Sequence, residues 1–137
     1  MRAAVVVVAL TVGVLAGCAQ AEESNWQAPD GYAYTLDSRC GEQLLIGKIR
    51  LWVQDGAVVR AVGLDEPGVR LQDTALENLP TLATLVGYYN DAVRADADTA
   101  KLETDPADGH PVRIDIDHSR QSMDDESCFV ISDYDPS

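Results

Sequence analysis

The chain has 137 residues, with 23 acidic and 10 basic side chains and a net charge of −13. This length suits a single domain, and the charge excludes nucleic acid as a partner because phosphates would be repelled. A basic protein or an envelope component is the kind of partner that such a surface attracts. The sequence contains no phosphate-binding loop, and we expect no cofactor.

The N-terminal residues have the order of a secretory signal. Arg2 precedes the apolar run Ala3–Ala16, and Leu15-Ala16-Gly17-Cys18 is similar to the lipobox of bacterial lipoproteins. The run is shorter than the roughly 20 residues of a membrane-spanning helix. We therefore expect residues 1–17 to be removed and Cys18 to receive a lipid. An ordinary cleaved signal peptide or a short membrane helix is the alternative.

A lipid on Cys18 would anchor the chain to the cell membrane on its extracytoplasmic side. Each buried acyl CH₂ contributes about 0.8 kcal/mol, so more than one chain holds a protein firmly. The mature chain would lose Arg2 and keep 9 basic against 23 acidic residues, a net charge of −14. In this oxidising compartment the remaining cysteines, Cys40 and Cys128, are expected to form a disulfide. Two buried free thiols are the alternative.

Residues 18–30 are polar, contain Pro29 and are interpreted as a tether, whereas residues 31–137 form the domain. Residues 32–37 alternate as a half-buried strand does. Asp55-Gly56 then separates strands over 48–53 and 57–64, which predicts a hairpin with a type I′ turn. In the simplest register Leu51 faces Arg60, which puts Arg60 on the core face, while Trp52 lies on the opposite face.

Residues 65–72, which include Pro67-Gly68, are predicted to be a loop. Pro80 suits the first turn of a helix, and we expect that helix from about Leu79 to about Ala95. Its apolar residues fall on one face at helical spacing: Leu82, Leu85, Val86, Tyr89 and Val93.

Three further strands are predicted over residues 101–105, 112–117 and 127–132, followed by a polar tail over 133–137. The order is three strands, one helix and three strands. Short connections favour antiparallel neighbours, so we predict an α+β fold. A largely antiparallel sheet of about six strands would carry one main helix on one face.

With these segments defined, the chain resembles a family of small secreted or lipid-anchored bacterial proteins, a domain of unknown function. The resemblance rests on Tyr32-x-Tyr34-Thr35, on Val53-x-Asp55-Gly56 after Lys48-Ile49-Arg50, on Asp105-Pro106-x-x-Gly109-x-Pro111, and on Ile114-Asp115-Ile116-Asp117 followed by Asp124-Asp125-Glu126. It covers roughly Tyr32–Tyr134. An aromatic residue tends to stand at the position of His110 in similar sequences. The resemblance implies a fold and an address but no activity.

Acidic residues near the C-terminus are the candidate metal ligands. Asp115, Asp117, Ser119 and Glu126 have the spacing of positions 1, 3, 5 and 12 of a calcium loop, but Arg120 occupies the position that needs glycine. A different cation site, for Ca²⁺, could use Asp115, Asp117, Asp124, Asp125 and Glu126. Alternatively, these carboxylates face solvent or shape a turn, and Arg113 and Arg120 neutralise them. His110 and His118 are weak candidates for zinc.

No pattern of residues indicates catalysis. Ser38 and Ser127 adjoin no base in sequence, and the paired carboxylates lack the aromatic cleft that a glycoside substrate needs. We expect a non-enzymatic binding or structural module at the cell envelope. A cation-dependent module and a small envelope hydrolase are the alternatives.

Overall fold

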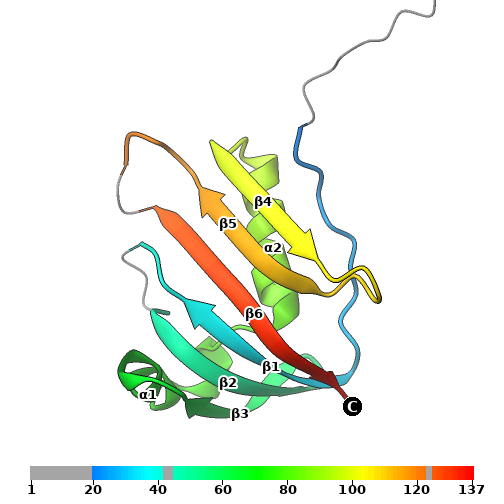
Figure 1. Cartoon of the computed structure of the whole chain (residues 1–137), viewed down its shortest axis with the longest axis vertical. Coiled ribbons are helices and arrows are strands. Elements are labelled where there is room, and N and C mark those ends of the chain that lie inside the picture. Colours follow the sequence, from blue (N-terminus) through cyan, green and yellow to red (C-terminus); the bar gives the residue numbers. More distant parts are fainter. Residues whose placement is uncertain (1–19, 42–44, 123–124) are drawn as a thin grey trace, which may run out of the picture.

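Six strands form one antiparallel sheet in the order β3-β2-β1-β6-β5-β4, with the long helix α2 behind it (Figure 1). The computed structural model describes residues 20–41, 45–122 and 125–137, so the predicted signal peptide, Cys18 and Asp124 lie outside the described residues. The strands are β1 Gly31–Ser38, β2 Gly47–Gln54, β3 Ala57–Gly63, β4 Thr99–Thr104, β5 Pro111–Asp117 and β6 Glu126–Pro136. The helices are α1 Glu66–Gln72, the 3₁₀ turn η1 Leu76–Asn78 and α2 Leu82–Arg94. The predicted α+β class and element order are confirmed.

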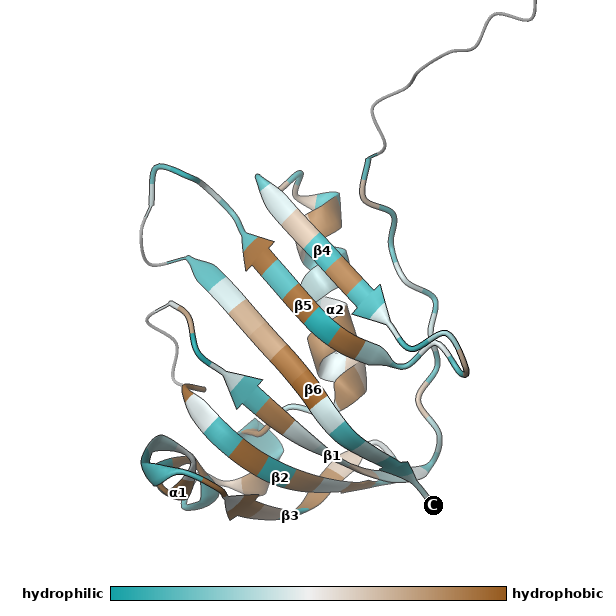
Figure 2. Cartoon of the chain, viewed as in Figure 1, coloured by the Kyte–Doolittle hydropathy of each residue, from teal (hydrophilic) through white to brown (hydrophobic). Residues whose placement is uncertain are grey.

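The core lies between α2 and one face of the sheet. Successive side chains of a strand point to opposite faces, and the strands accordingly alternate between apolar and polar residues (Figure 2). The buried cluster joins apolar residues of β1, β2, β5 and β6 to Leu82, Leu85 and Tyr89 of α2. Among the described residues, no helix has both the length and the apolar character required to cross a membrane.

Two tyrosines of the central strand β1 hold the N-terminus of α2. The hydroxyl of Tyr34 donates to the carbonyl oxygen of Pro80 (2.5 Å), and the backbone N–H of Leu82 donates to the hydroxyl of Tyr32 (2.9 Å). The Oγ1 of Thr81 accepts from the N–H of Thr84 and so caps the helix. The helix therefore begins at Leu82, after this cap, rather than near Leu79 as predicted.

The hairpin of β2 and β3 has the predicted turn but not the predicted register. Asp55 and Gly56 both have positive φ (49° and 77°), as a type I′ turn requires. A bulge then shifts the pairing, so that Arg60 lies opposite Trp52 instead of Leu51. Because one extra residue exchanges the two faces of a strand, Arg60 projects away from the core, and its predicted place on the core face is wrong.

The predicted loop over 65–72 is instead the short helix α1. The Oδ1 of Asp65 accepts from the backbone N–H of Gly68 (2.7 Å) and of Lys48 (3.0 Å). These hydrogen bonds, that from Lys48 first, lower the pKa of Asp65. Gly68 touches β2 so closely that a Cβ there would lie 1.9 Å from the carbonyl oxygen of Lys48. The Pro67-Gly68 pair thus permits a helix to pack on the sheet rather than marking a turn.

The predicted polar tail is the end of β6, which pairs with β1 as far as Pro136 opposite Tyr32. A register shift in this pairing falls where Asp133 has a positive φ of 49°. Tyr134 packs partly buried against the core cluster. The strand was predicted too short because its last residues are mostly polar. Tyr134 is the one large apolar side chain among residues 133–137, so no alternating apolar pattern marks this part of β6.

Candidate functional site

The described members of the predicted cation-ligand set, Asp115, Asp117, Asp125 and Glu126, do not form a cluster of ligand atoms. The side chain of Asp115 accepts from the Nε of Arg113 (2.8 Å), and Asp117 accepts from the backbone N–H of Ser119 (3.1 Å). Glu126 lies opposite Asp117 across the strands, and the Oδ1 of Asp125 is buried without a hydrogen-bond partner among the described residues. Of the described candidates, no three bring ligand atoms within 4.8 Å of one another.

A different group of ligand atoms lies in the turn between β4 and β5. Atoms of Asp105, Asp108 and His110 lie within 4.8 Å of one another, and sequence reasoning considered only His110 among them. Asp105 accepts from the N–H of Ala107 (2.8 Å), and Asp108 accepts from both the N–H and the Nδ1 of His110 (3.1 and 2.5 Å). These carboxylate oxygens therefore already accept hydrogen bonds within the turn.

His110 is part of an aromatic contact rather than an isolated loop histidine. Its ring stacks on Tyr134 of β6 with the centroids 4.1 Å apart, and hydrogen bonds from His110 lower the pKa of Asp108. A flat ring at this position thus packs against Tyr134. The structure does not place His118 in a common cluster with His110.

Cys40 and Cys128 form the predicted disulfide, with their Cα atoms 5.3 Å apart. The bridge joins the chain just after β1 to β6, and the Ser38–Phe129 pairing of these strands lies beside it. Ser38, which adjoins no base in the sequence, has a buried hydroxyl with no hydrogen-bond partner among the described residues. The Cys40–Cys128 disulfide, which lies near Ser38, offers no base to activate this hydroxyl.

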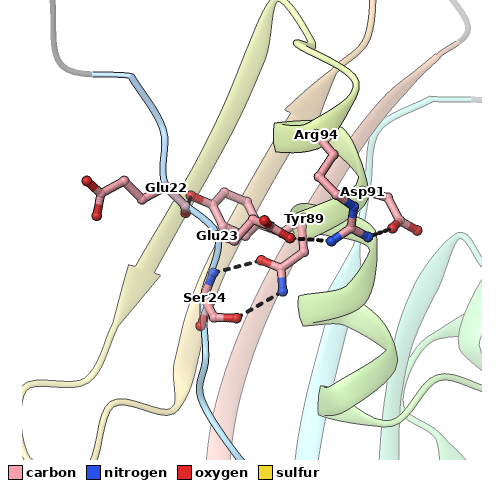
Figure 3. Close-up of polar contacts among 7 residues, drawn as sticks. Glu22, Glu23, Ser24, Tyr89, Asp91 and Arg94 are labelled. Atoms are coloured by element: carbon pink, nitrogen blue, oxygen red, sulfur yellow. Dashed lines mark hydrogen bonds and ion pairs between the residues drawn. The ribbon is translucent and has the colours of Figure 1, made fainter.

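The segment expected to be a tether is bound to α2 (Figure 3). The backbone of Ser24 exchanges two hydrogen bonds with the side-chain amide of Asn90, from its N–H to Oδ1 (2.7 Å) and to its carbonyl from Nδ2 (2.9 Å). The hydroxyl of Tyr89 donates to the carbonyl of Glu22 (2.7 Å), and Arg94 pairs with Glu23 and Asp91. From Glu22 on, this segment belongs to the domain.

Trp26 continues this attachment beyond α2. It packs against the core cluster and lies beside the β4–β5 turn, where a Cβ on Gly109 would be 3.6 Å from its ring. Before Glu22, Gln20 and Ala21 line an open cavity of about 390 Å³ with the end of α2 and the start of β4. The chain therefore leaves the described domain at this end.

The face of the sheet away from α2 carries the second candidate surface. The guanidinium carbon of Arg60 lies 4.4 Å from the ring centroid of Trp52, and that of Arg50 lies 5.6 Å from it. We call Arg50, Trp52 and Arg60 the arginine–tryptophan patch. The sequence pattern places Trp52 on this face, but the bulge that brings Arg60 to it has no recognised signal.

The chain belongs to a family of unknown function (DUF6174), whose model matches residues 19–136. The predicted membership of a family of unknown function is thereby confirmed. Neither the curated proteins nor the solved structures yield a match to the chain.

Proposed function

We propose that the chain is a bacterial lipoprotein, anchored outside the cell membrane through Cys18, that acts as a non-enzymatic binding module. The lipobox-like residues Leu15–Cys18 supply the anchor. One observation supports the proposal most: the segment that follows Cys18 is held on α2 by the Ser24–Asn90 and Glu22–Tyr89 hydrogen bonds. Such an attachment fixes the orientation of a domain relative to its anchor.

The distance between anchor and domain is short in this arrangement. Three residues separate Cys18 from Glu22, and four Cα–Cα steps of extended chain reach about 14 Å. The end of α2 and the start of β4, which lie beside Gln20 and Ala21, would therefore face the membrane. The opposite edge strand, β3, would lie farthest from it.

The candidate acidic residues already pair with neighbouring side chains, which supports a binding role rather than catalysis. Asp115 is paired with Arg113, and Asp108 with His110, so these carboxylates already have partners. The net charge of −13 favours basic partners at long range. An envelope component that approaches from the side away from the membrane meets the sheet first.

Metabolic labelling tests the anchor directly. Cells that express the full chain and take up an alkyne-tagged fatty acid should yield a labelled protein in the membrane fraction. Cys18→Ser should abolish the label, whereas Cys128→Ser, the matched control, should retain it. An unlabelled wild-type chain, or a label that persists in Cys18→Ser, would refute lipidation.

A further inference from the structure

The arginine–tryptophan patch lies on a part of the sheet that no described helix covers. Arg50 and Trp52 share the face of β2 opposite to the buried Ile49, Leu51 and Val53. Helix α1 contributes Leu71 to the core cluster, which lies on the opposite face of the sheet. It contacts β2 at Gly47, the first residue of that strand. The patch is therefore open to a partner.

The two arginines retain free donors in an acidic protein. Neither forms an ion pair with a described carboxylate. Arg50 uses Nη1 for the carbonyl of Asp133 and the hydroxyl of Thr35, which leaves its Nε and Nη2 without a partner among the described residues. A guanidinium has five donors that match carboxylates geometrically. Stacking on Trp52 limits the movement of both groups before any ligand arrives.

A small hollow adjoins the patch. It has a volume of about 190 Å³ and is lined in part by Ala33, Trp52, Val59 and Asp135. This is below the 300–1,000 Å³ or so of typical small-molecule sites, but it suits one side chain of a larger partner. Val59, 54% exposed, adds apolar surface at its rim. Arginine and tryptophan beside an apolar recess are typical of the residues that dominate protein interfaces.

The position of the patch argues against the membrane as its occupant. β2 is separated from the edge strand β4 by β1, β6 and β5, which at about 4.8 Å per strand amounts to roughly 20 Å. On the proposed function, β4 lies at the membrane-facing end. Anionic lipid headgroups would then lie at the β4 edge of the sheet, whereas Arg60 lies in β3 at the opposite edge.

We propose that the arginine–tryptophan patch binds an extended acidic segment of a partner protein. Its carboxylates bind Arg50 and Arg60, and an apolar side chain of the segment enters the hollow beside Trp52. This deepens the proposed binding role but does not need the lipid, so a failure of lipidation leaves it standing.

Trp52 itself reports on this binding. In the full chain, purified in a non-ionic detergent, Trp26→Phe leaves Trp52 as the only tryptophan. A short peptide of alternating aspartate and valine should shift the Trp52 emission, and the same peptide with asparagine for aspartate should not. Arg60→Gln should weaken binding about tenfold. Arg120→Gln, which removes the same charge between β5 and β6, should leave it unchanged. Calorimetry on the chain with Trp26 intact provides a second measurement.

Four outcomes would overturn the proposal. These are no emission change together with no heat of binding, equal weakening by Arg120→Gln, concentration-dependent emission without peptide, and tighter binding to anionic phosphatidylglycerol vesicles than to the peptide. The second would indicate general charge attraction, the third a second copy of the chain, and the fourth the membrane. A Trp52 shift that requires both aspartate and Arg60 supports the acidic segment.

Discussion

Asn90 makes two of the hydrogen bonds that hold the N-terminal segment on α2. Asn90→Ala removes both hydrogen bonds to the Ser24 backbone. Part-buried hydrogen bonds contribute about 0.5–1.5 kcal/mol each, so the loss amounts to about 1–3 kcal/mol. Alanine favours the helix interior over asparagine by about 0.5 kcal/mol, which offsets a part of it. We therefore expect the free energy of unfolding to fall by about 0.5–2.5 kcal/mol.

Two measurements separate docking from general stability. Urea unfolding gives the free energy, and hydrogen exchange at the amide of Ser24 reports the contact itself, which should lose its protection in Asn90→Ala. Asn78→Ala, the same change at an exposed residue of η1, should alter neither value. If Ser24 exchanged equally fast in the wild type and in Asn90→Ala, the segment would not be held by this side chain, and the fixed orientation would lose the support of the Ser24–Asn90 contact.

The remaining predictions concern the core. Tyr34→Phe leaves the carbonyl of Pro80 without its donor and should lower the free energy of unfolding, measured in urea, by about 1–3 kcal/mol. The control Tyr88→Phe, at a residue 43% exposed, should lower it hardly at all. Equal losses would contradict the hydrogen bond. Burial raises the pKa of Tyr34, so its contribution is complete below the unfolded-state pKa of about 10 and is lost as the pH rises above it. Tyr34→Phe should therefore flatten the alkaline loss of stability, and an unchanged alkaline slope would refute this. Reduction of Cys40–Cys128, which closes an 88-residue separation, should cost at most about 4–5 kcal/mol by loop entropy; a loss near zero would show that the unfolded chain gains little freedom.

Local patterns predicted the parts of the fold that local physics determines. Asp55-Gly56 predicted its turn because few residue pairs tolerate two positive φ values. The apolar spacing of Leu82, Leu85 and Tyr89 predicted α2 because one face of a helix must be buried. The bulge in β3 was not predictable, since Val59 carries no mark of an extra residue. Without it, Arg60 is assigned to the wrong face.

Apart from the disulfide, contacts between distant segments were not predictable from the sequence patterns. Ser24 and Asn90 are 66 residues apart, and a polar segment with Pro29 has the composition of a linker whether or not it is docked. Similarly, the sequence around Asp105, Asp108 and His110 is that of an ordinary polar turn. Only the structure shows that Tyr134 stacks on the imidazole. The spacing of Asp115 and Asp117 fits a calcium loop, but both residues lie in the strand β5.

Net charge and local charge lead to different partners for this chain. The value of −13 describes the field at long range, where a basic molecule is attracted. At contact distance the individual ion pairs matter, because salt screens beyond about 8–10 Å. Arg113 and Arg94 are paired with carboxylates, whereas Arg50 and Arg60 are stacked on Trp52 and form no ion pair with a described carboxylate. An acidic segment is therefore repelled at a distance and bound on contact, which predicts an affinity for the patch that rises, rather than falls, with moderate salt.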